Sequence, residues 1–574
     1  MENKSLIELE NVTFTYPGAE MPVLNDVSLT IDEGDFVAII GGNGSGKSTL
    51  CKTFNGLIPQ FYVGDFDGKV TVNGLDAENH TVAELSRHIG YVYQDFDNQL
   101  LRPTVIDDAC FVPLNYGLPD YRERGEWALE VTGLEGLNRE FIWQLSGGQK
   151  HLLALAGALA MKPKILIIDE PIAQLDPQHA KQIYDILKKL NTEYKMTIIV
   201  IEHHTEFIAE YCRNVILMDQ GKVFWKLETK KALSQVETLT ERNIFPPQVT
   251  QAAYLLGEGD YPITLAEAIE YFGVENNGKS GQITQPVQEA ESKQPMIQFE
   301  DVSLHYRTLK KLMKPALKDV NISLYDGDLI ALIGNNGAGK SSFIKLITGI
   351  IKPKIGDVLV EGINTKKTTP EKLSDFVSYV YQKPEEMFID DSVRKDIEYY
   401  LRARNVPEYG EIVEKLLVDF SLVDIQHQDG RLLSGGQQRR ASLAIGAAMN
   451  PSIILLDEPT ANLDIATKKQ MVQMLAKLQE HVKMVVVATH DMQLVSEWAN
   501  RVIVMNHGEV ISDANKDVIF ANEALMKKAG LVSPQILQLS QALKMENPCY
   551  TVEEFVARWK EEEARFERKM EFAR

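Results

Sequence analysis

The sequence has few cysteines and no long apolar run. Its 574 residues include four cysteines, none of which forms a CxxC pair: Cys51, Cys110, Cys212 and Cys549. Neither a zinc knuckle nor a disulfide framework is therefore expected. No apolar stretch approaches the roughly 20 residues that span a bilayer, and the N-terminus lacks the apolar core of a signal peptide. These absences predict a cytosolic protein, or one that binds a membrane only through a partner.

Positive charge is also in short supply. Lys and Arg total 60 against 81 Asp and Glu, which gives a net charge of −21. This balance disfavours nucleic acid as a partner, because phosphate binding requires clustered cations. A chain with this net charge can still have a local basic patch. Apolar residues at 44% and charged residues at 25% are ordinary for a globular protein. The length predicts two to four domains.

A glycine-rich loop that carries chemistry occurs twice. Residues 41–49 read GGNGSGKST and residues 334–342 read GNNGAGKSS, and each loop follows an apolar run typical of a buried strand. In such a loop, backbone N–H groups at a helix N-terminus can surround phosphate oxygens. Lys47 can reach the outer phosphates of a nucleotide, and the Ser48 hydroxyl can bind Mg²⁺. One copy alone could be a turn with a surface lysine, but the second copy favours phosphate binding.

The two halves of the chain repeat at a nearly constant offset. Lys47 corresponds to Lys340 at an offset of 293, whereas later motifs correspond at 288 or 287. The first half therefore has five more residues, which we place within 60–66. We expect a nucleotide-binding domain at 1–240 with a C-terminal extension at 241–275, then a flexible linker at 276–295. A second domain at 296–525 and its extension at 526–574 complete the repeat. The linker is long enough for one half to fold back on the other.

A glutamine and an aromatic residue recur at strand ends. Gln94 and Gln382 each follow the letters Tyr-Val-Tyr, and a carboxamide at this position can reach Mg²⁺ or an attacking water. Tyr16 and Tyr306 lie in the strand-like segments that precede the loops. Either tyrosine can stack on an adenine ring, and an ordinary strand aromatic is the alternative.

The pentapeptide LSGGQ also occurs twice, at 145–149 and 433–437, each time before an apolar helical pattern. A serine and two glycines at a helix N-terminus form an anion-binding arrangement. A single copy could be a helix cap. Two copies, each about 20 residues ahead of an apolar run that ends in Asp-Glu, point to a shared chemical task.

Those runs end in Asp169-Glu170 and in Asp457-Glu458. Four apolar residues before an acidic pair are typical of a strand buried in a parallel sheet. The aspartate can hold Mg²⁺, and the glutamate can polarise a water for in-line attack on a γ-phosphate.

A histidine follows the next apolar strand in each half, at His203 and at His490. Such a histidine can bond the γ-phosphate and hold the water in line. The neighbouring His204 leaves the first assignment open, and alignment with Thr489-His490-Asp491 favours His203.

These motifs, in this order and twice over, resemble the ATP-binding cassette (ABC) ATPases across nearly the whole chain. The resemblance implies an α/β fold with two tandem P-loop ATPase domains. Each would have a RecA-like core, an antiparallel β subdomain, a helical subdomain and a small C-terminal extension. It also implies that the cofactors are ATP and Mg²⁺. The two cassettes would pair head to tail within the chain, so that each ATP lies between the phosphate loop of one and the LSGGQ of the other.

The resemblance assigns roles residue by residue. The implied catalytic residues are Glu170, His203, Glu458 and His490. The implied Mg²⁺ ligands are Ser48, Gln94 and Asp169 in the first site, and Ser341, Gln382 and Asp457 in the second. The implied ATP-binding residues are Tyr16, Gly41, Asn43, Gly44, Gly46, Lys47, Ser48, Thr49, Gln94, Ser434, Gly435, Gly436 and Gln437 for the first site, and Tyr306, Gly334, Asn336, Gly337, Gly339, Lys340, Ser341, Ser342, Gln382, Ser146, Gly147, Gly148 and Gln149 for the second.

Neither site lacks a catalytic residue, so both are expected to hydrolyse ATP. The halves nevertheless differ at two places. Ile172 stands where the second half has Thr460, and Glu202 stands where it has Thr489. Unequal rates at the two sites would arise there.

The segments after the two glutamines are similar to those of the energy-coupling factor (ECF) ATPases, the cobalt and vitamin uptake type. Residues 94–100 read QDFDNQL and residues 382–388 read QKPEEMF. Each match to the Gln-x-Pro-acidic pattern is partial, because the first lacks the proline and the second lacks the second glutamine. The extensions at 245–249 and 532–536, each followed by a Thr-x-x-Glu helix start, also look like that family.

The ECF resemblance implies uptake of a small substrate at the cytoplasmic face of the cell membrane. The implied partners are a transmembrane T component and a substrate-binding S component, with no nucleic acid. Asp97, Glu385 and Glu386 are acidic where the coupling helices of the family's T component carry arginine. A solvated loop face is the alternative for these carboxylates.

Three other questions stay open from the sequence. The chain could be a soluble two-cassette ABC translation factor or the fused ATPase of a sugar importer. Residues 552–574 show helical spacing of apolar residues among mixed charges, which favours packing on the second cassette over a membrane-surface helix. The transported substrate cannot be read, because selectivity would reside in the membrane partner.

Overall fold

The computed structural model describes residues 4–172, 175–257, 259–273, 294–307, 313–461 and 463–561. Most of the linker expected at 276–295 therefore lies outside the described residues, as do the last apolar positions of the C-terminal segment. The chain forms two compact units, one of residues 1–277 with 555–574 and one of residues 278–554. Within the described part, no helix combines the length and apolar character that crossing a bilayer requires.

The first unit begins with a small antiparallel sheet. Its strand order is β2-β1-β4-β5, with β1 at Ser5–Thr15, β2 at Leu24–Asp32, β4 at Asp65–Val72 and β5 at Leu75–Asp76. Exposed and buried residues alternate along these strands because one face packs on the core and the other meets solvent. In register, Leu9 of β1 pairs with both Leu29 and Val70. This layer carries Tyr16, directly after β1.

A six-stranded mixed sheet forms the centre of the first unit, in the order β10-β9-β3-β8-β7-β6. Its strands are β3 at Phe36–Ile40, β6 at Ile89–Val92, β7 at Ile165–Asp169, β8 at Thr197–Ile201, β9 at Asn214–Asp219 and β10 at Lys222–Glu228. β6, β7, β8, β3 and β9 run parallel, and only β10 is antiparallel to its neighbour. Every residue of β3, β7 and β8 is buried, as expected for strands covered on both faces. Their carboxyl ends meet at one edge of the sheet, where the candidate site lies.

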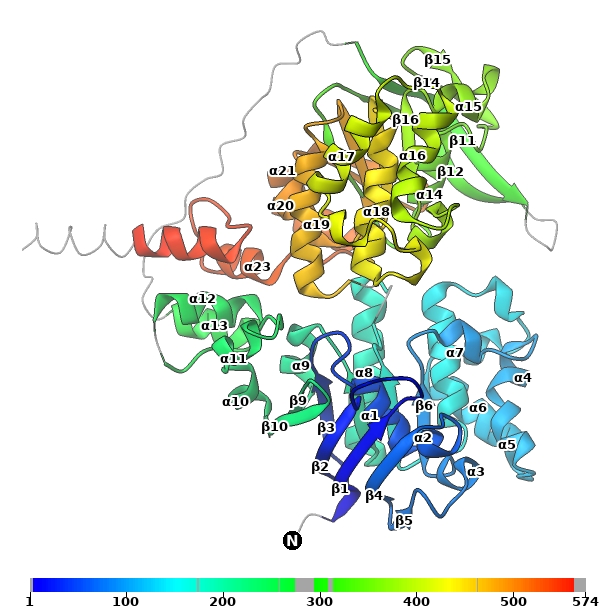
Figure 1. Cartoon of the computed structure of the whole chain (residues 1–574), viewed down its shortest axis with the longest axis vertical. Coiled ribbons are helices and arrows are strands. Elements are labelled where there is room, and N and C mark those ends of the chain that lie inside the picture. Colours follow the sequence, from blue (N-terminus) through cyan, green and yellow to red (C-terminus); the bar gives the residue numbers. More distant parts are fainter. Residues whose placement is uncertain are drawn as a thin grey trace, which may run out of the picture. The chain divides into compact units, whose positions relative to one another are not determined.

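Helices surround this sheet, and Figure 1 shows α4 to α7 gathered on the side of the first unit away from α10 to α13. The helices are α1 at Lys47–Phe54, α2 at Leu57–Gln60, α3 at Val82–Leu85, α4 at Val105–Ala109, α5 at Phe111–Asn115, α6 at Tyr121–Val131, α7 at Gly147–Leu159, α8 at Pro177–Tyr194, α9 at Thr205–Tyr211, α10 at Thr229–Leu233, α11 at Val236–Thr240, α12 at Gln248–Leu256 and α13 at Leu265–Gly273. Short 3₁₀ helices lie at Phe96–Gln99, Glu135–Leu137 and Ile142–Gln144.

The second unit repeats this plan. A four-stranded sheet has the order β12-β11-β14-β15, and a six-stranded sheet has the order β16-β17-β18-β13-β19-β20, which matches the first unit strand for strand. The strands are β11 at Ile297–Arg307, β12 at Met313–Leu324, β13 at Leu329–Ile333, β14 at Ile355–Val360, β15 at Ile363–Asn364, β16 at Val377–Val380, β17 at Ile453–Asp457, β18 at Met484–Thr489, β19 at Arg501–Asn506 and β20 at Glu509–Asn515.

The helices of the second unit include α16, α17 and α18, which lie together over one part of it in Figure 1. They are α14 at Lys340–Ile347, α15 at Pro370–Leu373, α16 at Val393–Ala403, α17 at Tyr409–Asp419, α18 at Gly435–Ala448, α19 at Ile465–Leu478, α20 at Met492–Trp498, α21 at Lys516–Ala521, α22 at Glu523–Ala529 and α23 at Gln535–Ala542. Short 3₁₀ helices lie at Thr365–Lys367, Pro384–Met387, Val423–Ile425 and Gly430–Leu432. The expected α/β architecture of two similar domains is confirmed.

The described part of the C-terminal segment contributes to the first unit. The ring of Phe272, in α13, lies 5.3 Å from the ring of Phe555 and 5.0 Å from that of Trp559. Three aromatic rings that shield one another from water favour this placement. The sequence-based preference for packing on the second domain is therefore not what the described residues show.

Candidate functional site

The glycine-rich loops follow β3 and β13 and lead into α1 and α14. Gly46 and Gly339 cap these helices with φ of 98° and 107°, and a Cβ at either would lie 2.8 or 2.7 Å from a backbone oxygen. Only glycine adopts this backbone so close to a neighbouring strand. The Lys47 ammonium donates to the carbonyls of Gly41 and Gly42 at 2.8 and 2.9 Å. The lysine therefore lies over the mouth of the loop, where an outer phosphate would sit.

An oxygen pair fits Mg²⁺ beside each loop. Asp169, at the end of β7, is buried and is hydrogen-bonded to Ser48. Burial raises the pKa of Asp169, and the Ser48 hydroxyl opposes that rise. Asp457 and Ser341 repeat the arrangement, with the Tyr379 hydroxyl donating to Asp457 at 3.2 Å. A carboxylate and a hydroxyl are hard oxygen ligands of the kind that Mg²⁺ takes together with phosphate oxygens.

Glu170 follows Asp169 in a left-handed backbone conformation, with φ of 51°, which is rare for a residue with a long side chain. One carboxylate oxygen accepts a hydrogen bond from Gln94 Nε2 at 2.6 Å. The other lies 3.3 Å from His203 Nε2. The strands β6, β7 and β8 thus bring together the glutamine, the glutamate and the histidine that the sequence placed far apart. The side chain of Glu170 is 21% exposed.

Glu458 occupies the same place in the second unit, with φ of 48°, but it has different neighbours. Its carboxylate lies 3.5 Å from Lys340 Nζ and 3.0 Å from His490 Nδ1, and it accepts from the His490 backbone N–H at 3.4 Å. Burial alone would raise the pKa of Glu458, but His490 and Lys340 outweigh it and hold that pKa below its usual value. The side chain is 9% exposed.

The two tyrosines expected near the adenine ring lie beside the phosphate-loop helices. The Tyr16 hydroxyl is 3.4 Å from Thr49 Oγ1, and the Tyr306 hydroxyl is 3.2 Å from Ser342 Oγ. Tyr16 also packs edge-on against Phe14 at 4.8 Å. Their stacking on adenine stays a prediction.

The LSGGQ serines cap α7 and α18. Ser146 Oγ accepts from the Gln149 N–H at 3.3 Å, and Gln149 Oε1 accepts from the Ser146 N–H at 3.0 Å. Ser434 and Gln437 form the same reciprocal pair, which is a capping box. In each half these residues start a helix in the helical subdomain rather than joining the phosphate loop of their own unit. Their role in the site of the other cassette stays a prediction.

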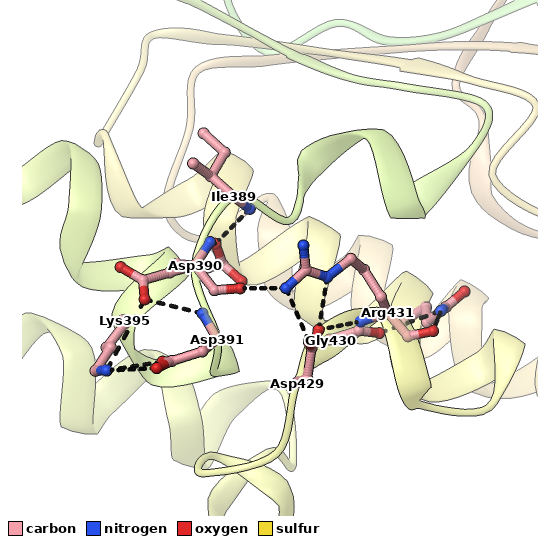
Figure 2. A network of polar contacts seen from close by, with 9 residues as sticks. Ile389, Asp390, Asp391, Lys395, Asp429, Gly430 and Arg431 are labelled. Atoms are coloured by element: carbon pink, nitrogen blue, oxygen red, sulfur yellow. Dashed lines mark hydrogen bonds and ion pairs between the residues drawn. The ribbon is translucent and has the colours of Figure 1, made fainter.

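The residues just before LSGGQ differ between the units, a difference that the motif analysis missed. In the first unit, Phe141 and Trp143 stack at 4.6 Å and are 39% and 52% exposed. In the second unit, Arg431 pairs with Asp429 at 2.8 Å and donates to the Asp390 carbonyl at 3.1 Å, as Figure 2 shows. An aromatic pair in one half is therefore replaced by an ion pair in the other.

The carboxylates expected to face a membrane partner are not equivalent. Asp97, in the 3₁₀ turn after Gln94, lies 2.9 Å from Lys150 Nζ in α7, a contact that the sequence did not suggest. Glu385 and Glu386 are exposed on the corresponding turn. The second unit has Gln438 in place of Lys150, and its side chain bonds the Gly430 carbonyl at 3.1 Å.

Each unit thus gathers a phosphate loop, an aspartate, a glutamate and a histidine at one sheet edge. In the first unit Gln94 joins them. Glu202, at which the two halves differ in sequence, lies directly behind His203 with both of its oxygens bonded. No motif in the sequence marks Glu202, because its burial beside His203 is visible only in the structure.

Comparison with known proteins agrees with this geometry. The family model of the ABC transporter matches residues 24–173 and 317–461. A putative ABC transporter ATP-binding protein of Methanosarcina mazei is 33% identical over 95% of both chains. Another, of Caldanaerobacter subterraneus, is 32% identical over 95% of this chain and 97% of its own.

A solved structure is also similar to part of the chain. It is that of cbiO1 from Clostridium perfringens, described as part of the ABC transporter complex cbiONQ. It is 32% identical, with a TM-score of 0.39, and the match covers 45% of this chain and all of that one. On the family match and the full-length relatives, the chain belongs to the ATP-binding proteins of ABC transporters, with two cassettes that hydrolyse ATP with Mg²⁺.

Proposed function

We propose that this chain is the motor subunit of an ECF-type importer, which couples ATP turnover at two composite sites to uptake of a small substrate such as a vitamin or a metal ion. The proposed partners are a transmembrane T component and a substrate-binding S component at the cytoplasmic face of the cell membrane. The observation that carries the proposal is the pair of acidic turns after Gln94 and Gln382, which lie beside α7 and α18, the helices that start at the two LSGGQ segments.

The geometry of these turns supports a docking role. Gln99 bonds back to β6, because its Oε1 accepts from the Tyr93 N–H at 2.8 Å and its Nε2 donates to the Tyr91 carbonyl at 3.0 Å. The turn is therefore fixed to the strand that leads to Gln94. A partner that moved this turn would also move Gln94, which touches Glu170.

Within each site we assign the following steps. Glu170 and Glu458 take a proton from the attacking water as it forms its bond to the γ-phosphorus, and ADP leaves. His203 and His490 orient that water and the γ-phosphate, while Lys47 and Lys340 hold the outer phosphates. Ser48 with Asp169, and Ser341 with Asp457, would hold Mg²⁺, which when bound would neutralise charge on the phosphates.

The head-to-tail arrangement is also part of the proposal. Ser146 and Ser434 each start a helix whose N-terminal N–H groups are suited to an anion. We infer that each helix end closes the ATP site of the other cassette. Binding of ATP would then draw the cassettes together and hydrolysis would release them.

Affinity purification from membranes tests the proposal. The full chain, tagged and isolated in mild detergent, should bring a small hydrophobic T-type protein and a substrate-binding membrane protein with it. Recovery of ribosomal proteins instead would favour the translation-factor alternative, and recovery of sugar-permease subunits would favour the sugar-importer alternative. The exposed Glu385 and Glu386 favour the ECF reading over both.

A further inference from the structure

A buried carboxylate lies directly behind the histidine of the first site. Glu202 follows β8, and only 2% of its surface is exposed. Its Oε1 accepts from the backbone N–H groups of His203 and His204 at 2.8 and 2.9 Å. Its Oε2 accepts from the Tyr184 hydroxyl at 2.9 Å. Both oxygens of the carboxylate are therefore bonded, and two of the three bonds hold the histidine loop.

These bonds restrict the direction in which His203 points. Two consecutive N–H groups that share one oxygen fix the orientation of both peptide planes, because each plane must present its N–H to the same atom. The Cα–Cβ direction of His203 follows from these planes. With the backbone held in this way, His203 presents its Nε2 to Glu170 at 3.3 Å.

Tyr184 anchors the carboxylate from α8. The tyrosine is fully buried, and its ring packs on those of Phe207 and Tyr211 at 4.9 and 5.0 Å. Such aromatic packing leaves the hydroxyl little freedom. Glu202 is therefore held from its far side by a rigid cluster, rather than by a mobile surface group.

The second site lacks this arrangement. Thr489 and Val472 stand in place of Glu202 and Tyr184. The Thr489 hydroxyl accepts from the Asp491 N–H at 3.0 Å, and the His490 N–H donates to Glu458 itself at 3.4 Å. Glu458 there faces Nδ1 of the histidine, not Nε2. The glutamate thus faces Nε2 of the histidine in the first site and Nδ1 in the second. The residue before the histidine differs as well, because it is Glu202 in the first site and Thr489 in the second.

We propose that Glu202 is a positioning residue of the first ATP site, which fixes the backbone after β8 so that His203 directs Nε2 at Glu170. The inference depends on the proposed roles of Glu170 and His203 in hydrolysis. Glu202 acts through His203, because its oxygens bond the N–H groups of His203 and His204 and the Tyr184 hydroxyl. The task is to accept hydrogen bonds with the right geometry, so a neutral amide oxygen serves in place of the carboxylate.

The experiment uses the full chain with Glu458→Gln, so that the hydrolysis measured comes from the first site. Single-turnover hydrolysis with protein in excess over ATP, the ATP affinity and the melting temperature are measured for each variant. Glu202→Thr installs the residue of the second site and should slow hydrolysis roughly tenfold with ATP affinity unchanged. Glu202→Gln keeps an acceptor oxygen and should stay within about twofold of the parent.

Two further comparisons separate positioning from loss of structure. Tyr184→Phe leaves one carboxylate oxygen without its donor and should slow hydrolysis a few-fold. The matched control is Tyr211→Phe, which removes a hydroxyl that bonds Asp185 at 2.8 Å in the same aromatic cluster and should leave the rate unchanged. In a His203→Ala chain, Glu202→Thr should have no additional effect, because its influence passes through the histidine.

The outcomes are distinguishable. If His203→Ala slows hydrolysis but Glu202→Thr does not, or if the two effects multiply, the inference about Glu202 is overturned while the proposed role of His203 stands. If His203→Ala itself leaves the rate unchanged, the proposed role of the histidine fails first. A loss in Glu202→Gln as large as that in Glu202→Thr would show that charge, not geometry, is what the site uses.

Discussion

Glu170 and Glu458, the glutamates that we propose as general bases, follow the same motif and have the same left-handed backbone, yet their surroundings differ. Glu170 contacts Gln94 and the Nε2 of His203, and its side chain is 21% exposed. Glu458 contacts Lys340 and the Nδ1 of His490, and it is 9% exposed. The two units share one order of motifs, and in both of them a glutamate and a histidine lie together. Which atoms of these residues are in contact differs between the units, together with residues outside the motifs such as Glu202 and Thr489. In the first site the glutamate is hydrogen-bonded to Gln94, and in the second it is paired with Lys340.

The largest expected effect tests whether the two glutamates perform the same task. Glu170→Gln together with Glu458→Gln should lower hydrolysis by about a thousandfold while ATP still binds, because an amide cannot take a proton from water. Steady-state phosphate release and nucleotide binding measure the two properties. Glu193→Gln, on the exposed end of α8, is the matched control. Residual hydrolysis within tenfold of the parent would remove the general-base role from both sites.

A smaller effect tests which LSGGQ segment contributes to which ATP site. Ser434→Arg should slow hydrolysis more than tenfold in a Glu458→Gln chain, which reports the Lys47 site, and about twofold in a Glu170→Gln chain. Ser146→Arg should give the opposite pattern. The physical reason is that an arginine at the helix start blocks the N–H groups that would meet the γ-phosphate. Single-turnover rates measure both, and the reverse pattern would rule out head-to-tail pairing.

The third prediction compares the acidic turns of the two units, where Asp97 is paired and Glu385 and Glu386 are exposed. Glu385→Lys with Glu386→Lys should abolish recovery of the proposed membrane partner, with hydrolysis by the isolated chain within about twofold of the parent, because both side chains are exposed. Asp97→Lys should weaken recovery less, since Asp97 is already paired with Lys150. Co-purification from membranes and phosphate release provide the measurements. Unchanged recovery in the double variant would leave the two carboxylates as ordinary surface charge.

The smallest effect concerns His151, which corresponds to Arg439 in the second cassette. His151 is buried and stacks on Phe96 at 4.6 Å, and burial lowers its pKa to about 4. The unfolded chain binds the proton more readily than the folded one, so stability falls as pH drops from about 6.5 towards about 4, by at most about 3 kcal/mol.

Calorimetry at several pH values checks this expectation. The melting temperature of the first cassette should fall more steeply over this pH range in the parent than in His151→Gln, which cannot titrate. Arg439 keeps its charge here, because burial lowers its pKa only to about 10. The second cassette should therefore lack this component. Parallel curves for the parent and His151→Gln would contradict the assignment.

Much of the site could be predicted because its parts are local. A phosphate loop is a short stretch of backbone between a strand and a helix, so its letters suffice to identify Lys47 and Ser48. The acidic pairs follow apolar runs whose length and composition indicate buried strands. The α/β fold, ATP hydrolysis and the use of Mg²⁺, which the resemblance to the ABC ATPases implied, are confirmed.

The remainder depends on packing between distant segments. The pairing of Asp97 with Lys150 and the bond from Tyr184 to Glu202 join residues that no local pattern relates. The left-handed conformation of the two glutamates also has no signal in the letters around them. The exchange of Phe141 and Trp143 for an ion pair was visible in the sequence, but nothing there indicated that the rings would stack on the surface. The predicted roles of the site residues, the domain boundaries and the ECF assignment stay predictions.

The left-handed backbone of Glu170 and Glu458 has a consequence for how this protein can evolve. Glycine adopts that conformation freely, whereas a side chain there costs on the order of 1 kcal/mol or more of folding free energy in each cassette. A chain selected only for robustness would exchange both glutamates for glycine. Glu170→Gly and Glu458→Gly should therefore stabilise their cassettes while removing the proposed general bases. The two glutamates are thus retained against a cost in stability.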